Sequence, residues 1–173
     1  TGKERWSFDP QIRFSKTPAR LKCLGVSYWR DSKADPQAAC THRIFSGTSD
    51  RRLLAVDARD GKPCPGFGNN GQVDVEPLFA AGAIVRDLSA AVGAPVLVND
   101  VLVIGHINNM KNLAARAPSG EIRAFDARSG AFLWRFDPVP RNPADLQAAT
   151  WTAESLANTG GGVQIELHAP VTG

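Results

Sequence analysis

The sequence predicts an all-β fold built from repeated four-stranded units, as in part of a β-propeller, and three observations predict it. Its apolar runs are strand-sized and alternate with polar residues, three segments share one glycine-turn pattern, and helix signals are weak. Only residues 76–91 have a helix-tolerant composition, and Pro77 and Gly82 interrupt it. With 173 residues, the chain is long enough for one domain with its own core.

The repeated pattern is a glycine turn that follows a strand. Two full copies, in 52–68 and 121–138, place Asp-Ala-Arg before the turn, and an abbreviated copy opens the chain at 1–10. The turn glycines recur at two comparable intervals along the chain: Gly2, Gly61 and Gly130. A recurrence on this scale is typical of a repeat architecture.

Both full copies contain a strand with period-two alternation. Leu53 and Ala55 point to one side of the first strand, whereas Leu54 and Val56 point to the other. The second copy sets Ile122, Ala124 and Asp126 against Arg123, Phe125 and Ala127. Asp-Gly at 60–61 and Ser-Gly at 129–130 supply the positive-φ residue of a tight hairpin.

Further strand candidates precede each hairpin. They lie at 43–47 before the first full copy, and at 96–98 and 101–107, around an Asn-Asp turn, before the second. About four strands per period, joined by tight turns, is the content of one propeller blade. We therefore expect a fragment of about two to three blades.

Bulky aromatic residues follow the turns. Trp6 and Trp134 are placed to act as wedges between blades, because each blade of a propeller buries its faces only against its neighbours. Phe67 stands in the middle copy and is expected to play the same part. The alternative is that these residues are ordinary core aromatics.

Composition narrows the class of protein. The net charge of +3 is small and its basic residues are spread out, so we expect solvated side chains and no nucleic-acid partner. Examples of these basic residues are Arg13, Lys16, Arg20, Arg51, Arg52 and Arg141. No run approaches the ~20 apolar residues of a membrane span, so no transmembrane segment is expected in this chain. Cys23, Cys40 and Cys64 lack metal-ligand spacing, and both one disulfide with a free thiol and three thiols remain open.

A few titratable residues invite a catalytic interpretation. Asp57 and Asp126 could be read as paired carboxylates, but their place in the repeated turn predicts hydrogen bonds to the hairpin backbone instead. His106, at a strand end, is either close to a cofactor or an ordinary loop or core histidine. His168 is expected to be incidental. We therefore expect no catalytic residue in this chain.

Three phrases of the sequence carry a family resemblance: CLGVSYW, RIFSGTSDRRLLAVDARDGKPCPGFGNNGQVDV and PSGEIRAFDARSGAFLWRFDPVPRNP. They resemble the membrane-bound quinoprotein dehydrogenases that use pyrroloquinoline quinone (PQQ), especially the glucose and quinate/shikimate dehydrogenase branch. The TGK unit followed by Trp6 resembles the tryptophan-docking motif of that family's eight-bladed propeller. The resemblance covers 1–162, a partial propeller, and leaves 163–173 as an unmatched tail.

The resemblance implies a propeller that binds PQQ and Ca²⁺ or Mg²⁺ on its axis. It also implies a parent protein at the periplasmic face of the inner membrane. In such enzymes the quinone accepts a hydride equivalent from an alcohol carbon of a sugar or cyclic polyol, and electrons leave to ubiquinone. The cation polarises the quinone carbonyl as a Lewis acid.

The resemblance also assigns positions near the cofactor: Arg20, Leu24, Gly25, His106 and Asn108, with Asn109 at the cation site. Leu24 stands where the family has Arg, so it cannot form a charge-assisted pair with the carboxylates of the cofactor. Asn109 falls within the family's Asp-Asn pair and supplies no carboxylate, although hard cations prefer anionic oxygen ligands.

The sequence therefore predicts part of a PQQ-dependent sugar or polyol dehydrogenase that is inactive by itself. Its partners would be the missing propeller blades, a sugar or cyclic polyol substrate and ubiquinone. The rival hypothesis is a non-catalytic propeller module that pairs its open edge with another chain and acts as a scaffold.

Overall fold

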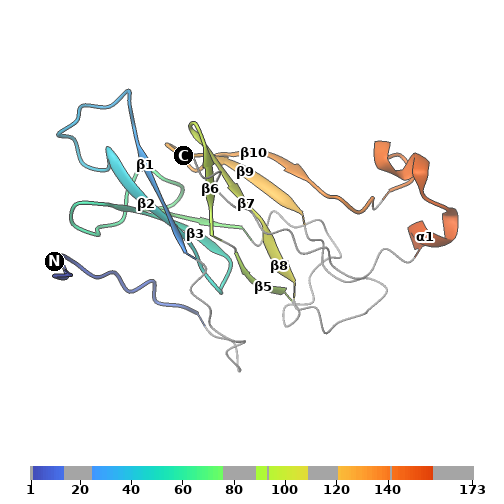
Figure 1. The fold of residues 1–173 in the computed structure, drawn as a ribbon, viewed down its shortest axis with the longest axis horizontal. Helices are drawn as coiled ribbons and strands as arrows, with labels where there is room; N and C mark the ends of the chain where they lie inside the picture. The colour runs from blue at the N-terminus through green and yellow to red at the C-terminus, as the bar shows by residue number, and fades with distance from the viewer. Residues whose placement is uncertain are drawn as a thin grey trace.

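The computed structural model describes residues 2–13, 25–75, 89–92, 94–108, 121–140 and 142–157. Two four-stranded sheets dominate this part of the chain, and a two-stranded ribbon accompanies them (Figure 1). The first sheet consists of β1 (Val26–Arg30), β2 (His42–Gly47), β3 (Arg52–Asp57) and β4 (Gln72–Asp74). The second sheet consists of β6 (Val96–Val98), β7 (Val101–Ile104), β9 (Ile122–Asp126) and β10 (Phe132–Phe136). The ribbon pairs β5 (Ser89–Val92) with β8 (His106–Asn108).

Each four-stranded sheet is an antiparallel meander. In the first, neighbours follow the order β1-β2-β3-β4, and in the second the order is β6-β7-β9-β10. A four-stranded meander of this kind is one propeller blade. The prediction of four-stranded units is therefore confirmed, and the described residues form two such blades.

One local prediction is wrong. The strand expected at 101–107 ends at Ile104, and β8 begins after Gly105 and pairs with β5 instead. A glycine weakens a strand interior and permits this change of partner. Residues 89–91 of the helix-tolerant segment, for which no helix was predicted, form β5 together with Val92 and pair with β8. The rest of that segment, 76–88, lies outside the described residues.

Two single-turn helices follow the second sheet. They are the 3-10 helix η2 (Leu146–Thr150) and the α-helix α1 (Ala153–Ala157), which lie away from both sheets in Figure 1. Thr152 Oγ1 accepts the backbone N–H of Ser155 at 3.1 Å, which satisfies a donor in the first turn of α1. Helices this short have no extended periodic pattern, and so the sequence did not predict them.

The hydrophobic core lies between the two sheets. Its buried members come from both blades: Trp29, Phe45, Leu53, Ala55, Cys64, Phe67, Val75, Leu102, Ile104, Phe125 and Ala127. Leu53 and Ala55 enter this core, whereas Leu54 and Val56 lie outside the cluster. The predicted alternation is therefore confirmed for β3. The same alternation brings Phe125 of β9 into the core.

The expectation that the basic side chains are solvated is wrong for residues 51–52. Arg51 and Arg52 are buried rather than solvated. The Arg52 guanidinium donates to Asp50 Oδ2 at 2.9 Å and to the carbonyl of Pro10 at 2.7 Å. Arg52 therefore links the N-terminal segment 2–13 to the β2–β3 turn. Because Asp50 and Pro10 are far apart in sequence, composition alone could not predict this link.

Candidate functional site at the seam between the two blades

Two aromatic side chains rest on two turn glycines. A Cβ on Gly61 would come within 2.5 Å of Trp6 Cε3, and the Trp6 indole N–H donates to the carbonyl of Ala58 at 3.0 Å. A Cβ on Gly130 would come within 3.2 Å of Phe67 Cε2. Both glycines have φ of +73°, a conformation that side chains with a Cβ rarely adopt. The wedge prediction is therefore confirmed for Phe67, which lies in the core between the two sheets, whereas Trp6 covers a turn of the first sheet with no second described sheet beside it.

Trp134 differs from these two residues. It lies on β10, the outer edge strand of the second sheet, and 45% of it is exposed. It occupies no seam between the sheets of the described residues, so its predicted wedge role is not met there. The reason is topological, because the second sheet stacks against the first through its other face.

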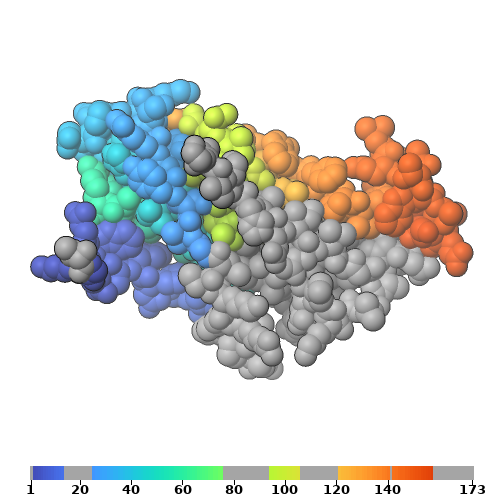
Figure 2. Space-filling view, viewed as in Figure 1, coloured from blue at the N-terminus to red at the C-terminus, as the bar shows by residue number. Residues whose placement is uncertain are grey.

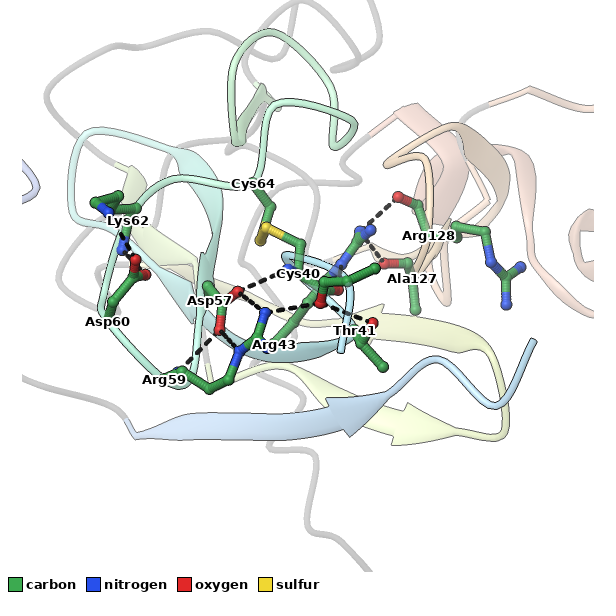
Figure 3. Close-up of a disulfide and its surroundings, with 11 residues drawn as sticks. Cys40, Thr41, Arg43, Asp57, Arg59, Asp60, Lys62, Cys64, Ala127 and Arg128 are labelled. Carbon is green, nitrogen blue, oxygen red and sulfur yellow. Dashed lines mark hydrogen bonds and ion pairs between the residues drawn. A yellow bond between two sulfur atoms is a disulfide. The ribbon is translucent and has the colours of Figure 1, made fainter. Parts of the chain in front are cut away.

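Arg43 joins the two blades at the end of the seam where β9 finishes. It starts from β2, is only 7% exposed, and its Nη1 donates to the carbonyls of Ala127 at 3.0 Å and Arg128 at 2.5 Å (Figure 3). Its guanidinium also lies 5.3 Å from the ring centroid of Trp29, within the range of a cation–π contact. Burial lowers the pKa of Arg43 from its ordinary value, as desolvation disfavours the charged form.

A second cation crosses the seam in the opposite direction. Arg128, from the turn after β9, donates through Nε to Asp31 Oδ2 at 2.6 Å and through Nη2 to Asp31 Oδ1 at 2.8 Å. The hydrogen bonds from Arg128 lower the pKa of the buried Asp31 carboxyl to about 2. Arg128 also lies 5.4 Å from the Trp29 ring, so one indole is flanked by two guanidiniums. Such a bidentate pair fixes orientation as well as contributing energy.

A buried ion pair closes the other end of the same seam. Arg123 of β9 donates through Nε to Glu121 Oε1 at 2.6 Å, and its Nη1 donates to the carbonyl of Val75 at 3.0 Å. Both side chains of the pair are almost fully buried. Burial lowers the pKa of Arg123 from its ordinary value. The seam is therefore held by apolar packing in its middle and by Arg side chains at both ends.

The repeated aspartates hold their own hairpins. Asp57 Oδ1 accepts the backbone N–H of Arg59 at 2.9 Å, and Asp126 Oδ1 accepts the backbone N–H of Ser129 at 2.6 Å. The Arg59 guanidinium holds the pKa of Asp57 well below its usual range. The structural interpretation of both aspartates is therefore confirmed, and neither is paired with the other as a catalytic carboxylate.

A disulfide stabilises the hairpin that contains Asp57. It joins Cys40 to Cys64, with 5.7 Å between their Cα atoms, and Asp57 Oδ2 accepts the backbone N–H of Cys40 at 2.6 Å (Figure 3). The sequence left open either one disulfide or three thiols, and the structure has the disulfide. The third cysteine, Cys23, lies outside the described residues. The bond links the β1–β2 loop to the segment that carries Phe67.

The structure describes only some of the positions expected near the cofactor. Arg20, Leu24 and Asn109 lie outside the described residues, Gly25 directly precedes β1, and His106 and Asn108 bound β8. Ser27 donates to the carbonyl of Pro95, and Val96 pairs with Val103, so the start of β1 and the end of β7 share one end of the stack. The structure therefore brings Gly25 and the beginning of β8 to the same end. The Arg128–Asp31 pair lies at the opposite end, where β1 and β9 finish.

The described residues contain no group of three or more His, Cys, Asp or Glu side chains that could hold a metal ion. In the same part of the chain, no helix has the length and apolar character needed to cross a membrane.

The sequence missed the residues that join the blades. Arg43, Arg128 and Asp31 were not singled out, because a charged residue on a predicted strand is most often a solvated one. The Asp-Ala-Arg repeat contained a signal, since Arg59 and Arg128 hold equivalent places in it. Their partners nevertheless differ: Arg59 binds Asp57 within its own hairpin, whereas Arg128 reaches across the seam.

Stacked four-stranded meanders, with aromatic rings on the turn glycines Gly61 and Gly130, define part of a β-propeller. Residues 1–163 match the family described as PQQ: Glucose/ethanol/alcohol dehydrogenase, beta-propeller domain, and the chain belongs to this family. The predicted resemblance to the quinoprotein dehydrogenases is therefore confirmed.

Three relatives illustrate the range of the family. The glycerol dehydrogenase large subunit of Gluconobacter oxydans (strain 621H) is 39% identical over 137 residues, which cover 79% of this chain and 18% of that protein. Quinoprotein glucose dehydrogenase A of Acinetobacter calcoaceticus is 33% identical over 154 residues, covering 83% and 19%. Quinate/shikimate dehydrogenase (quinone) of Acinetobacter baylyi (strain ATCC 33305 / BD413 / ADP1) is 32% identical over 158 residues, covering 83% and 19%. The chain thus spans about a fifth of the length of the curated relatives it matches.

Proposed function

We propose that this chain supplies two neighbouring blades of a PQQ-dependent dehydrogenase that oxidises an alcohol carbon of a sugar or polyol. The observation that carries the proposal is the packing of aromatic rings on turn glycines, Phe67 on Gly130 between the blades and Trp6 on Gly61, in a chain of the quinoprotein family. Glucose, glycerol and quinate dehydrogenases among the relatives support a sugar or cyclic polyol as substrate. In this proposal residues 1–162 are the propeller part and 163–173 lie beyond it.

The cofactor would approach one end of the stack. Bound PQQ would supply the oxidising quinone, and electrons would leave to ubiquinone at the periplasmic face of the inner membrane. Gly25 and β8, which hold positions that the family resemblance places near the cofactor, share one end of the stack. Arg20, Leu24, Gly25, His106 and Asn108 are the proposed cofactor-side positions. Because Leu24 carries no charge, this blade would contribute shape and apolar contact there rather than an ion pair.

A cation site does not fit the described residues. No cluster of carboxylate, imidazole or thiolate donors is present in them, and the proposed ligand Asn109 offers one neutral oxygen. Ca²⁺ takes six to eight oxygen ligands and Mg²⁺ six, mostly from carboxylates, carbonyls and water. Any cation of the complete enzyme would therefore depend on ligands from other blades, and we derive no step through it.

The chain is expected to be inactive by itself. The sequence assigns it no catalytic acid or base, and its two blades leave apolar strand surface open on β1 and β10. A closed propeller buries such surface between blades. Completion of the ring by further blades is thus a condition for turnover in this proposal.

The test separates the family role from the activity of the chain. The purified chain is incubated with PQQ and Ca²⁺ or Mg²⁺, and dye reduction is followed with glucose, glycerol and quinate. We expect no turnover, and turnover would overturn the proposed inactivity.

A chimera then tests the role itself. The chain replaces the matching segment of the Gluconobacter glycerol dehydrogenase large subunit, and PQQ-dependent dye reduction is expected. A folded chimera that binds no PQQ would overturn the role. The same chimera with Trp6→Ala measures how much the contact of Trp6 contributes to PQQ binding.

A non-catalytic propeller module is the second candidate. Leu24 in place of the family Arg and the exposed apolar strand β10 favour it, because both suit a propeller that binds a chain rather than a charged cofactor. PQQ binding by the folded chimera would exclude this candidate.

A further inference from the structure

The Cys40–Cys64 disulfide joins two segments of the first blade that both contact the second blade. Cys40 lies in the loop between β1 and β2, just before the strand that carries Arg43. Cys64 lies in the loop between β3 and β4, which also carries Phe67. Arg43 crosses the seam to the carbonyl of Ala127 (Figure 3), and Phe67 is part of the core between the sheets. The disulfide is therefore linked to a polar and to an apolar contact between the blades.

The Cys40 half of the disulfide orients the arginine that crosses the seam. The carbonyl of Cys40 accepts a hydrogen bond from Arg43 Nε at 2.9 Å, and Nη1 of the same guanidinium donates to the carbonyl of Ala127 at 3.0 Å. Because a guanidinium is planar and rigid, a bond at Nε fixes the direction of the Nη1 donor. Asp57 Oδ2 accepts the backbone N–H of Cys40 at 2.6 Å and holds this residue in place. The position of Cys40 therefore determines whether Arg43 reaches the second blade.

The Cys64 half of the disulfide holds a turn that also reaches the second blade, on the side of the molecule where the first sheet meets the second (Figure 2). The backbone N–H of Phe67 donates to the carbonyl of Cys64 at 2.9 Å, which closes this turn. The next residue, Gly68, donates its N–H to the carbonyl of Ser129 at 2.8 Å, so the turn forms a backbone hydrogen bond across the seam. Cys64 and Phe67 are fully buried. The position of Cys64 therefore affects both a core ring and a backbone bond between the blades.

We propose that the Cys40–Cys64 disulfide is a redox site at which a dithiol reductant loosens the contact between the two blades. One thiolate of the reductant attacks Cys40 Sγ, the bond between the cysteine sulfurs breaks, and Cys64 leaves as a thiolate that takes up a proton. The second thiol of the reductant then releases Cys40 as a thiol, and the reductant becomes a disulfide after giving up two electrons and two protons.

The burial of the two cysteines sets the direction of this attack. Cys40 is only partly buried, whereas Cys64 is fully buried, and thiol–disulfide exchange depends on access to the attacked sulfur. After reduction, Arg43 and Phe67 are no longer held by one covalent link, so both of their contacts with the second blade weaken. The strand pairing of the first sheet involves neither sulfur and remains. Reduction therefore acts on the seam and not on the sheet that contains the disulfide.

A thermodynamic cycle separates this role from the general effect of a disulfide on the unfolded chain, which does not depend on Arg43. Urea unfolding is measured for the oxidised and the dithiothreitol-reduced chain, both with Cys23→Ser to remove the third thiol, and again with Arg43→Met added. We expect reduction to lower the folding equilibrium constant at least about tenfold more with Arg43 than with Met. Arg123→Met is the matched control, because Arg123 crosses the seam to the carbonyl of Val75 at the other end, and it should leave the effect of reduction unchanged. Equal effects of reduction with Arg43 and with Met would overturn the proposal.

Amide hydrogen exchange of the Cys23→Ser chain needs no substitution in the seam and decides the case if Arg43→Met fails to fold. The Gly68 N–H, which donates to Ser129 across the seam, should exchange at least about tenfold faster after reduction. The Thr48 N–H, which donates to the carbonyl of Arg52 within the first sheet, is the control and should keep its rate. An unchanged rate at Gly68, or an equal increase at Gly68 and Thr48, would overturn the proposal.

The site of attack is tested with glutathione, a monothiol, in place of the dithiol. The reaction is quenched with acid, and the modified cysteine is located by peptide mapping with mass spectrometry. We expect the mixed disulfide on Cys40, because its sulfur is the more accessible one. A mixed disulfide on Cys64 would overturn the proposed attack on Cys40.

Discussion

Replacing Arg43 with Met should separate the two blades more than any other single polar change in the seam. The substitution keeps much of the side-chain volume but removes the donors to the carbonyls of Ala127 and Arg128. Hydrogen bonds that involve a charged group contribute about 1.5 to 3 kcal/mol each. With two such bonds lost across the seam, the free energy of unfolding should fall by about 3 kcal/mol. This is a large share of the ~5 to 15 kcal/mol typical of a domain.

The assay is urea unfolding of the full chain at neutral pH, followed by circular dichroism and fluorescence. Arg59→Met is the matched control, because the Arg59 side chain is 42% exposed and its ion pair lies within one hairpin. That variant should lose less than about 1 kcal/mol, as for other exposed pairs. If Arg43→Met and Arg59→Met unfold at the same urea concentration, Arg43 does not hold the blades together.

Three further predictions use the same unfolding assay. Reduction of the Cys40–Cys64 bond, which spans 24 positions, should cost about 3 kcal/mol, and an unchanged urea midpoint would contradict this. Gly130→Ala should cost about 2 kcal/mol because φ is +73°, whereas Gly66→Ala, with nothing within 4 Å of its Cβ, should be neutral. The pKa of Asp31 is about 2 in the folded chain against an ordinary value of 3.8, so the unfolded chain binds the proton first on acidification. Its contribution of about 1 to 2 kcal/mol is present above about pH 4 and is lost as the pH falls towards 2, which a pH series of unfolding midpoints tests against Asp31→Asn.

The strands and hairpins were predictable from the sequence because their signals are local. Leu53 and Ala55 alternate with Leu54 and Val56 over a few residues, and the core receives the first pair. The turn glycine Gly61 follows Asp60 as a hairpin requires. Local sequence fixes such features since a strand's two faces and a turn's φ angles are decided within a few residues.

The contacts between the blades could not be predicted in the same way. Arg43 and Ala127 are 84 positions apart, and nothing in either local pattern indicates the other. The cysteine pairing has the same character, because three cysteines allow three single disulfides and only the fold brings Cys40 to Cys64. The cofactor-side positions were assigned by family resemblance alone, and the structure places only Gly25 and β8 among them.

The two sides of a contact between neighbouring units differ, because one side supplies an aromatic ring and the other a turn glycine. This difference determines which groups at the two ends of a row of blades have no partner. Each seam takes an aromatic ring from one unit and a turn glycine from the next, as Trp6 with Gly61 and Phe67 with Gly130 demonstrate. A stack with two glycines therefore needs two rings from the units before them, and a third ring, Trp134, remains exposed on β10. Segment 2–13 fills the first acceptor without bringing a sheet with it, so apolar surface of β1 stays open on that side. The two open faces follow from the repeat itself rather than from any irregularity of this chain, because only a closed ring of blades matches every ring with a glycine.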